Sequence, residues 1–253
     1  MNSPRVRIAE WALFAIGLAM FVYHMFSTQY LLLGAYEGQT VHLGFILTLL
    51  FLNEARKATT PWTYCLQLVL AALGLVATAY VFMNIGHLEE AFGYPNPTDL
   101  IVGIILIVLV VEATRVAWGW TLPIVTAIFV LYFFYGHLLP GQLHHREFAL
   151  DYIVSYLSIG LSGIFGSFLS ISANQVFLFV VFGALLGVIK VHDFFFEAGK
   201  IAGKFFQGGP GQTAVVSSAL IGMVSGAAVA NVAIVGAFTI PFMKKVGYKP
   251  DFA

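Results

Sequence analysis

Long apolar stretches, separated by short polar segments, run along most of the chain. The hydrocarbon core of a bilayer is about 30 Å thick and needs about 20 mostly apolar residues in a helix, so each such stretch predicts a membrane-spanning helix. The pattern therefore predicts an all-α integral membrane protein with about six transmembrane helices. The predicted spans are residues 8–26, 41–53, 64–83, 100–117, 118–135 and 175–189, of which the second is short.

Two segments have patterns that differ from a plain span. Residues 152–169 are apolar but interrupted by glycine and serine, which indicates an interfacial or re-entrant segment. Residues 191–206 combine charged and aromatic residues at an amphipathic spacing, which predicts a helix lying at the membrane surface. The glycine-rich run 208–211 is expected to end that helix.

The composition supports a membrane protein and excludes several other classes. Hydrophobic residues make up 60% of the chain and charged residues 9%, whereas soluble domains carry about 25% charged residues. Twelve basic and twelve acidic residues balance, which excludes nucleic-acid binding by bulk charge. The single cysteine, Cys65, excludes an intramolecular disulfide framework and a CxxC metal cluster. The expected partner is the lipid bilayer.

The distribution of basic residues predicts the orientation of the chain. With a cytoplasmic N-terminus and alternating helices, Arg5, Arg7, Arg56, Lys57 and Arg115 fall on the inner side, as the positive-inside rule requires. The first apolar run is interpreted as a retained helix rather than a cleaved signal peptide, because no small-residue cleavage site follows it.

The last apolar stretch, residues 213–243, is followed by three lysines. If this stretch enters and leaves the membrane on the same side, eleven of the twelve basic residues lie inside, all but Arg146. The small residues 225–228 stand in its middle, where the chain could turn. The stretch therefore predicts two half-helices that meet inside the membrane, as one re-entrant helical hairpin.

The tip of such a hairpin is a candidate ion site. Non-helical backbone at membrane depth is tolerated only where protein buries it or water lines it, and half-helix ends offer carbonyl oxygens to cations and N–H groups to anions. Ser225 supplies a hydroxyl, Gly226 permits close approach of the backbone, and Asn231 supplies an amide oxygen. The alternative is plain helix–helix packing, because glycine, alanine and serine also form tight membrane interfaces.

The end of the chain resembles a known transporter family. Residues 222–253, GMVSGAAVANVAIVGAFTIPFMKKVGYKPDFA, closely resemble the large permease subunit of tripartite ATP-independent periplasmic (TRAP) transporters, above all the fused permeases of the TAXI subfamily. Residues 172–186 (SANQVFLFVVFGALL) and 208–226 (GGPGQTAVVSSALIGMVSG) also resemble the large subunit. Residues 112–125 (EATRVAWGWTLPIV) are similar to the small-subunit-like part of the fused chains.

The resemblance implies a secondary active transporter rather than an enzyme. Members of the family use a Na⁺ gradient to import an organic anion, often a carboxylate, which a periplasmic binding protein delivers; they are multi-pass proteins of the bacterial inner membrane. Na⁺ is the coupling ion, and no other cofactor is implied. The implied ion and substrate residues are Ser225, Gly226, Ala227, Ala228 and Asn231, with Na⁺ at Ser225, Gly226 and Asn231. Ala227 stands where a serine is common in the family.

The resemblance also implies a division of the chain. Residues 1–136 are expected to be small-subunit-like (DctQ-like) scaffold helices, and residues 137–253 the start of the large-subunit (DctM-like) transport domain. Family permeases continue beyond the motif that ends here at Ala253, so the chain is expected to be the N-terminal portion of a fused permease, truncated after the first hairpin. The alternative is a permease fragment with a scaffold role only.

Three further constellations offer other chemistry. Glu112 and Arg115 are three residues apart on a helix and can pair. A structural pair or a snorkelling arginine is expected, and a proton relay is the alternative. The loop cluster His137, His144, His145 and Glu147 contains metal-ligand residue types, but its spacing matches no helical metal motif.

The run Gly160–Gly163 matches the GxSG pattern of rhomboid-type intramembrane proteases. On that remote alternative, Ser162 would need a histidine from a neighbouring helix to activate it. The candidate histidines are His24, His42 and His192.

Overall fold

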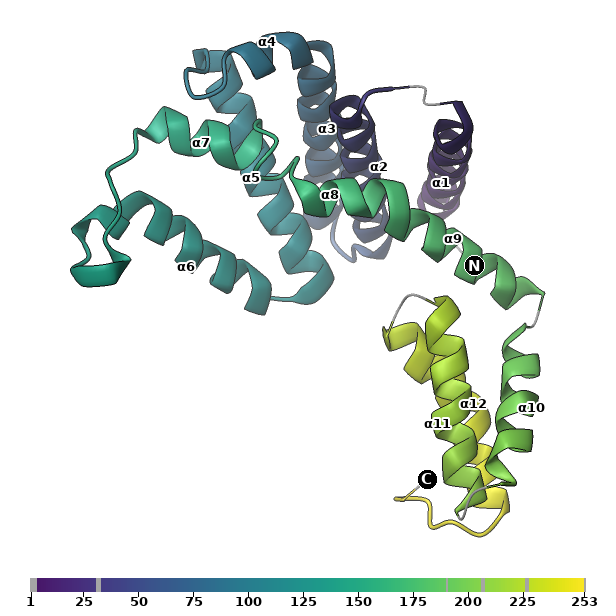
Figure 1. Ribbon diagram of the computed structural model, residues 1–253. Coiled ribbons are helices and arrows are strands. Elements are labelled where there is room, and N and C mark those ends of the chain that lie inside the picture. Colours follow the sequence, from purple (N-terminus) through teal and green to yellow (C-terminus); the bar gives the residue numbers. More distant parts are fainter. Residues whose placement is uncertain (1–3, 31–32, 190, 206–207, 226–227, 253) are drawn as a thin grey trace. The chain divides into compact units, whose positions relative to one another are not determined.

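The computed structural model of the protein describes residues 4–30, 33–189, 191–205, 208–225 and 228–252, and the regular structure in these ranges is helical (Figure 1). The chain divides into two compact units, residues 1–173 and 174–253. The predicted all-α class is confirmed for the described residues.

The first unit contains eight α-helices and two short 3₁₀ turns among the residues that are described. They are α1 (Pro4–Tyr30), α2 (Ala35–Lys57), α3 (Pro61–Met83), α4 (Ile85–Glu90), α5 (Pro97–Trp118), α6 (Thr121–Tyr135), η1 (Gly136–Leu138), η2 (Gly141–Leu143), α7 (Leu150–Ser158) and α8 (Ser167–Ile171). A π-helical turn, η3 (Ser172–Val176), leads into the second unit, which contains α9 (Phe177–Val188), α10 (Val191–Gly203), α11 (Gly209–Ser225) and α12 (Ala228–Lys245).

The core of the first unit lies where α2 packs against α3 and both meet α5. Glycines allow the α2–α3 approach, since a Cβ at Gly74 would lie 3.2 Å from Leu47 Cβ and one at Gly44 would lie 2.9 Å from Thr78 Oγ1. Thr60 caps α3, because its side chain accepts a hydrogen bond from the Thr63 N–H. The largest fully buried apolar side chains here include Leu47, Phe51, Val81, Leu88, Leu106 and Leu109.

Five described helices are long and apolar enough to cross a membrane: Ala9–Tyr30, Pro61–Met83, Pro97–Trp118, Thr121–Leu138 and Ser167–Val188. They coincide with five of the six predicted spans. The remaining one, residues 41–53, lies within α2, whose ends carry several charged residues, and its crossing of the membrane stays a prediction. The close succession of α5 and α6 follows from Gly119, whose φ of +77° suits glycine in a two-residue connection.

The segment with the interrupted pattern forms a short helix followed by a turn. α7 ends at Ser158 and α8 begins at Ser167. In the turn between them, a Cβ at Gly163 would collide with the Leu157 carbonyl, so the chain needs glycine at this point. A helix, α10, covers Val191–Gly203 of the predicted segment 191–206. Its position at the membrane surface stays a prediction.

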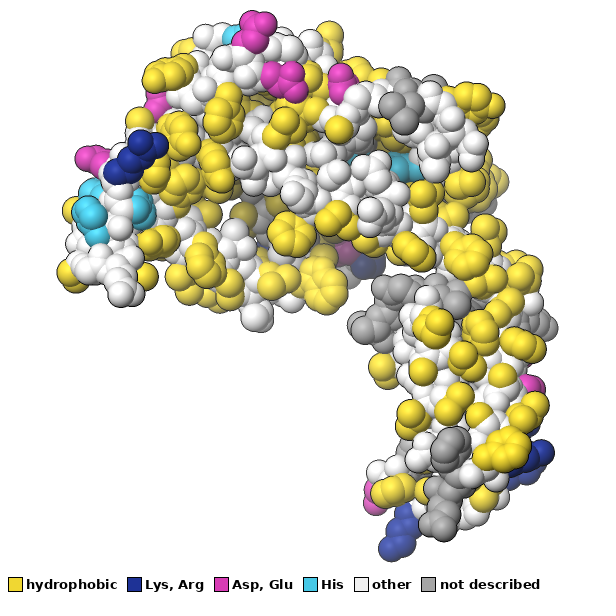
Figure 2. All heavy atoms as spheres, viewed as in Figure 1, with side chains coloured by type: hydrophobic (Ala, Val, Ile, Leu, Met, Phe, Trp, Pro, Cys, Tyr) yellow, Lys and Arg dark blue, Asp and Glu magenta, His cyan; other side chains and the backbone are white. Residues whose placement is uncertain are grey.

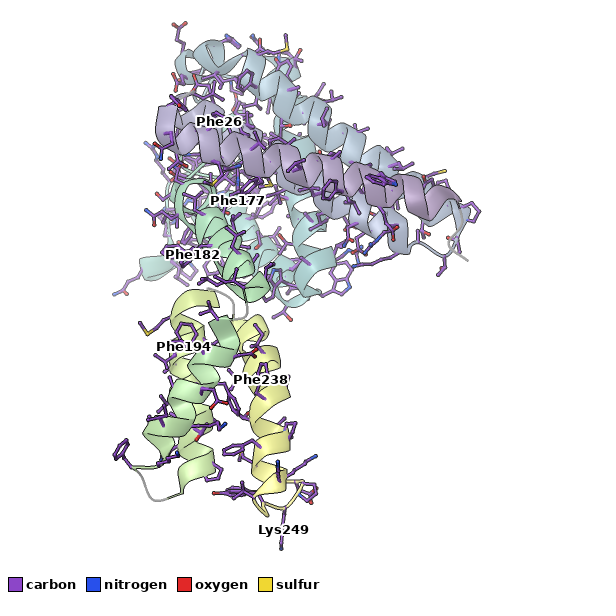
Figure 3. The ribbon with its side chains drawn as sticks, turned by 90° about the vertical axis from the view of Figure 1, so that its right-hand side faces the viewer. Phe26, Phe177, Phe182, Phe194, Phe238 and Lys249 are labelled. Atoms are coloured by element: carbon purple, nitrogen blue, oxygen red, sulfur yellow. The ribbon has the colours of Figure 1, made fainter. Side chains whose placement is uncertain are left out.

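In the second unit, α10, α11 and α12 pack beside one another (Figure 3). Phe196 of α10 stacks on Phe238 of α12 with ring centres 5.5 Å apart, and it meets Phe242 edge-on at 5.9 Å. These contacts join the surface helix to the end of the chain.

Candidate functional site

The α11–α12 hairpin occupies the place of the predicted ion site. The two helices pack against each other, and residues 226–227 join them. α11 has 17 residues and α12 has 18, which at 1.5 Å per residue gives about 26 and 27 Å, less than the thickness of a hydrocarbon core. Two adjacent helices are therefore present where the two half-helices are predicted. Their re-entry into a membrane stays a prediction.

The predicted site residues fall at and just below the hairpin tip. Ser225 ends α11 and Ala228 begins α12, with their side chains outside the description, while Gly226 and Ala227 lie outside the described residues altogether. Asn231 is described fully. Three residues of helix separate it from Ala228, so it lies about 4.5 Å along the helix axis from the start of α12.

Asn231 reaches from α12 across to α11. Its Nδ2 donates to the Ser218 carbonyl oxygen at 3.2 Å and lies 3.1 Å from Ser218 Oγ. These contacts fix which way the amide points, because they use its N–H groups. The amide oxygen is therefore held away from Ser218.

The Oδ1 atom of Asn231 is buried and has no hydrogen-bond partner among the described residues. Leaving a buried acceptor unpaired costs about 1–3 kcal/mol. A ligand that bonds to this oxygen would remove that cost. A neutral amide oxygen is a suitable ligand for a hard cation such as Na⁺. Asn231 thus supplies one oxygen of the kind that the sequence predicts for the hairpin tip.

Gly222 makes room for this amide. A Cβ at Gly222 would lie 3.0 Å from Asn231 Nδ2 and 3.7 Å from its Cγ. Sequence reasoning did not include Ser218 or Gly222 in the site. Their spacing is the available signal, since Ser218 and Gly222 are four residues apart and lie on one face of α11.

The hairpin also brings two helix ends together. The last carbonyl groups of α11 and the first N–H groups of α12 lie on either side of the tip. A helix C-terminus favours cations and an N-terminus favours anions. The C-terminus of α11 therefore provides partial negative charge for a cation, and the N-terminus of α12 provides partial positive charge for an anion.

α10 packs on another face of α11. Thr213 and Ser217 of α11 are buried, and a Cβ at either Gly203 or Gly199 of α10 would collide with their hydroxyl groups. The Thr213 hydroxyl donates to the Gly209 carbonyl at 2.9 Å. These polar groups therefore serve helix packing, unlike the Asn231 amide.

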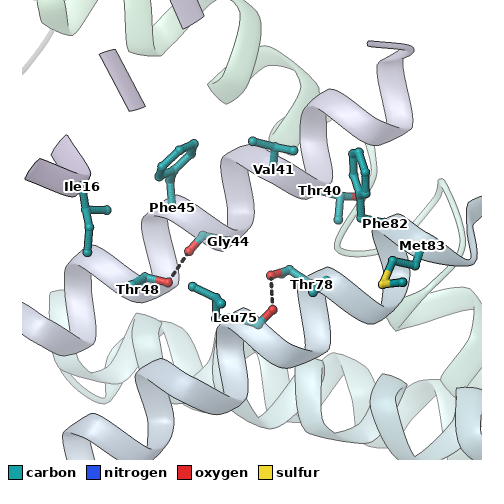
Figure 4. Close-up of a pocket in the computed structure, with 11 residues that line it drawn as sticks. Ile16, Thr40, Val41, Gly44, Phe45, Thr48, Leu75, Thr78, Phe82 and Met83 are labelled. Atoms are coloured by element: carbon teal, nitrogen blue, oxygen red, sulfur yellow. Dashed lines mark hydrogen bonds between the residues drawn. The ribbon is translucent and has the colours of Figure 1, made fainter. Parts of the chain in front are cut away.

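An apolar pocket of about 390 Å³ lies between α1, α2 and α3 (Figure 4). The three threonines in its wall donate to carbonyl groups of their own helices: Thr40 to Tyr36 at 2.8 Å, Thr48 to Gly44 at 2.7 Å, and Thr78 to Gly74 at 2.8 Å. No charged side chain lines it among the described residues. The pocket has little chemistry to offer a polar ligand.

The residues of the protease alternative are arranged differently from a Ser162 site. Ser162 is exposed in the turn after α7. His42 Nε2 instead lies 3.1 Å from Ser172 Oγ, and its Nδ1 lies 2.8 Å from His24 Nε2. The buried histidine pair thus joins α1, α2 and η3, while the His192 side chain lies outside the description.

The other two constellations also have defined positions. Both Arg115 nitrogens Nε and Nη2 donate to the Glu112 carboxylate at 2.6 Å, and the guanidinium lies 5.4 Å from the centre of the Trp120 ring. The expected structural pair is therefore present. In the loop cluster, both ring nitrogens of His145 face carbonyl oxygens, Nδ1 at 2.6 Å from Arg146 and Nε2 at 3.0 Å from Tyr132.

Comparison with known proteins shows that more than half of the chain matches a transporter component. Residues 105–253 match the family described as the tripartite ATP-independent periplasmic transporter, DctM component. The uncharacterized protein y4mL of Sinorhizobium fredii (strain NBRC 101917 / NGR234) is 32% identical over 108 residues, which cover 37% of this chain and 26% of that relative. The chain thus spans about a quarter of that relative's length. No solved structure matches the chain significantly.

Proposed function

Since the chain belongs to the DctM component family of tripartite ATP-independent periplasmic transporters, we propose that it is a membrane permease component of a secondary active transporter that imports an organic anion with Na⁺. The anion is a carboxylate, and a periplasmic substrate-binding protein delivers it. Membership of a transporter family agrees with the prediction that the chain is not an enzyme.

The observation that carries this proposal is the buried, unpaired Oδ1 of Asn231. It lies one turn from a hairpin tip where two helix ends meet, so one Na⁺ ion would receive the amide oxygen together with α11 carbonyls. Ser225 and Gly226 are the further proposed Na⁺ residues, and Ala227 and Ala228 complete the proposed ion and substrate site.

The first part of the chain has a different proposed role. The family match begins at residue 105, inside α5, so helices that precede the match accompany the permease part, as in the fused permeases of the TAXI subfamily. Residues 1–136 act as a small-subunit-like scaffold, and residues 137–253 begin the transport domain. The apolar α1–α3 pocket, with its hydroxyl groups committed to backbone carbonyls, supports a scaffold.

The proposed location is the bacterial inner membrane, with the N-terminus in the cytoplasm. The five candidate spans support a multi-pass protein. Arg56, Lys57 and Arg115 lie at the ends of helices on the side assigned to the cytoplasm.

Sodium binding by the purified full chain tests the site directly. Thermal unfolding is measured in detergent with NaCl, and with choline chloride at equal ionic strength. The wild-type chain is expected to unfold at a higher temperature in NaCl, because a ligand that binds only the folded state stabilises it. Asn231→Leu, which removes the amide oxygen at similar size, is expected to abolish this difference.

Asn53→Leu is the matched control, since the Asn53 amide oxygen accepts a hydrogen bond from Arg56 in the other unit. It should keep the full sodium effect. A sodium effect of equal size in Asn231→Leu would contradict the proposed ion site. If the wild-type chain itself shows no sodium effect, the scaffold-only alternative becomes the better description of this chain.

A further inference from the structure

A second cavity lies between α6 and α7 of the first unit. Its volume is about 690 Å³, and it is contained within the first unit. One wall comes from α6, a candidate membrane span, and the other from α7 and the loop that precedes it. The side chains that matter for its chemistry are Thr126, Phe129 and Val130 on α6, His145 and Arg146 on the loop, and Tyr156 on α7.

A stack of aromatic rings forms the loop-side wall. Phe148 stacks on Tyr152 with ring centres 5.5 Å apart and planes 12° apart, and Tyr152 stacks on Tyr156 at 6.2 Å. Phe133 of α6 meets Phe148 and Tyr156 edge-on, at 5.3 and 5.5 Å. These ring contacts pack the loop against both α6 and α7, so the loop forms an ordered wall of the cavity.

The mouth of this cavity carries the guanidinium of Arg146 and the ring of His145. His145 Nδ1 lies 2.6 Å from the Arg146 carbonyl and Nε2 lies 3.0 Å from the Tyr132 carbonyl; only the imidazolium form can donate to both. The Arg146 guanidinium lies 4.9 Å from the centre of the Phe148 ring. Figure 2 shows a cationic side chain, histidine side chains and a neighbouring acidic side chain over the loop between α6 and α7.

These charges lack a counter-ion in the described part of the chain. The ion pairs found there do not include Arg146. Of the two nearest carboxylates in sequence, Asp151 accepts a hydrogen bond from the Tyr152 N–H at 2.9 Å, and Glu147 is exposed. An exposed arginine over an aromatic ring presents its N–H groups to an anion.

The depth of the cavity is apolar. The wall of α6 runs from Tyr132 near the mouth to Thr126, six residues or about 9 Å along the helix axis. Pro123 is the one buried residue among those described in α6, so the helix leaves most of its apolar surface uncovered. Exposed residues here include Leu122, Ile124, Ile128, Phe129 and Leu131.

We propose that this cavity binds an anionic phospholipid, with its phosphate at Arg146 and an acyl chain along α6. The charged mouth matches the headgroup, and the apolar wall matches hydrocarbon. A free phosphate ion would leave the apolar wall uncovered. An apolar helix of a second copy would cover that wall but leave Arg146 without an anion.

Lipid binding to the purified full chain tests the proposal. Delipidated protein in detergent is titrated with dioleoylphosphatidylglycerol or dioleoylphosphatidylcholine, and bound lipid is counted by native mass spectrometry. We expect about tenfold tighter binding of the anionic lipid, because the phosphate of phosphatidylcholine is balanced by its own ammonium group and attracts Arg146 less. Inorganic phosphate is added as a competitor and is expected to displace little of the lipid.

Two variants separate the headgroup from the chain. Arg146→Gln is expected to remove the preference for the anionic lipid, and Arg146→Lys to keep part of it. Val130→Trp, which fills the apolar wall, should weaken both lipids alike. Arg56→Gln is the matched control, because it removes an equally charged, exposed arginine that pairs with Glu10 instead.

Three results would overturn the proposal: equal binding of the two lipids by the wild-type chain, a full preference retained in Arg146→Gln, or displacement of the lipid by phosphate alone. A chain that is dimeric and binds no lipid would do the same, since it would assign the cavity to a second copy. Circular dichroism of each variant establishes that it is folded.

Discussion

Two helix pairs in this protein both approach closely at glycines, but their polar side chains form different hydrogen bonds. In the α2–α3 pair, Gly44 and Gly74 let the helices approach, and the Thr48 and Thr78 hydroxyls donate to carbonyls of their own helices. In the α11–α12 pair, Gly222 lets the helices approach, but the Asn231 amide crosses to the other helix and its oxygen stays unpaired.

This difference separates a scaffold from a candidate site. A hydroxyl that bonds to the preceding turn of its own helix leaves little for a ligand to gain. A buried oxygen with no partner raises the energy of the folded state until a ligand binds. Buried acceptors without a partner also occur on α2 and α3, at Gln39 Oε1 and Gln67 Oε1. An unpaired acceptor therefore indicates a candidate ion site only where two helix ends also meet beside it, as they do near Asn231.

The largest expected effect sharpens the scaffold side of the comparison. Gly74→Leu forces a large side chain against Leu47, which is buried, and overpacking of this kind costs about 1–3 kcal/mol. Thermal unfolding of the purified chain should show a clear fall in midpoint, while the midpoint difference between NaCl and choline chloride persists. Gly17→Leu is the control, since a Cβ at Gly17 meets nothing within 4 Å.

Loss of the sodium effect in Gly74→Leu, with the protein still folded, would break the comparison. It would mean that the α2–α3 pair contributes to ion binding rather than to the scaffold. A Gly17→Leu variant as unstable as Gly74→Leu would instead show that added apolar volume, and not the close approach to Leu47, causes the fall.

The helices that could be predicted from the sequence are those with a long apolar stretch. The long apolar stretches predicted five helices that match candidate spans, because burial in lipid requires a continuous apolar helix. α2 is harder to assign, since Glu37, Glu54 and Lys57 stand on a helix whose middle is buried among protein side chains. Periodicity does not distinguish a lipid-facing apolar residue from one that packs on protein.

The candidate site was predictable only in part. Asn231 stood out as a polar residue in an apolar stretch, but its partner Ser218 lies 13 residues earlier, and only the hairpin's register brings the two together. The direction of the amide could not be predicted at all. The direction of the amide is set by the Nδ2 group, which meets the Ser218 carbonyl of α11. This contact results from the packing of the two helices and not from a sequence pattern.

A smaller effect is expected from removing one hydroxyl in each pair. Thr78→Val should change stability by about 0.5 kcal/mol or less, because the Gly74 carbonyl keeps its helical hydrogen bond. Ser218→Ala removes one acceptor that orients Asn231, and should weaken sodium binding about threefold to tenfold at a stability cost of about 1 kcal/mol. Thermal unfolding over a range of NaCl concentrations measures both quantities.

The comparison fails if Thr78→Val and Ser218→Ala shift the sodium dependence equally. The different hydrogen bonds of the Thr78 and Ser218 hydroxyls would then not explain which helix pair binds sodium. Ser217→Ala offers a second control within α11, because the Ser217 hydroxyl is buried on the α10 side and should leave sodium binding unchanged.

The smallest expected effect is a response to pH that belongs to the first unit. Hydrogen bonds to the Tyr132 and Arg146 carbonyls raise the pKa of His145 above its ordinary value of 6.5. A raised histidine pKa stabilises the folded state below the ordinary value, and this contribution is lost as the pH rises through the raised pKa. The groups nearest the ring are Tyr132 on α6, Phe148, and the neighbouring Arg146 and Glu147 on the loop.

Raising the pH above 6.5 should therefore loosen the loop between α6 and α7 while the α11–α12 pair keeps its protection. Amide hydrogen exchange of residues 136–149, corrected for the intrinsic effect of pH, should increase severalfold between pH 6 and 8.5. His145→Gln, which cannot titrate, should exchange fast at both pH values, and His144→Gln should behave like the wild-type chain. The same pH response in His145→Gln would show that another group controls the loop, because the imidazolium between two carbonyls would then not be what holds it.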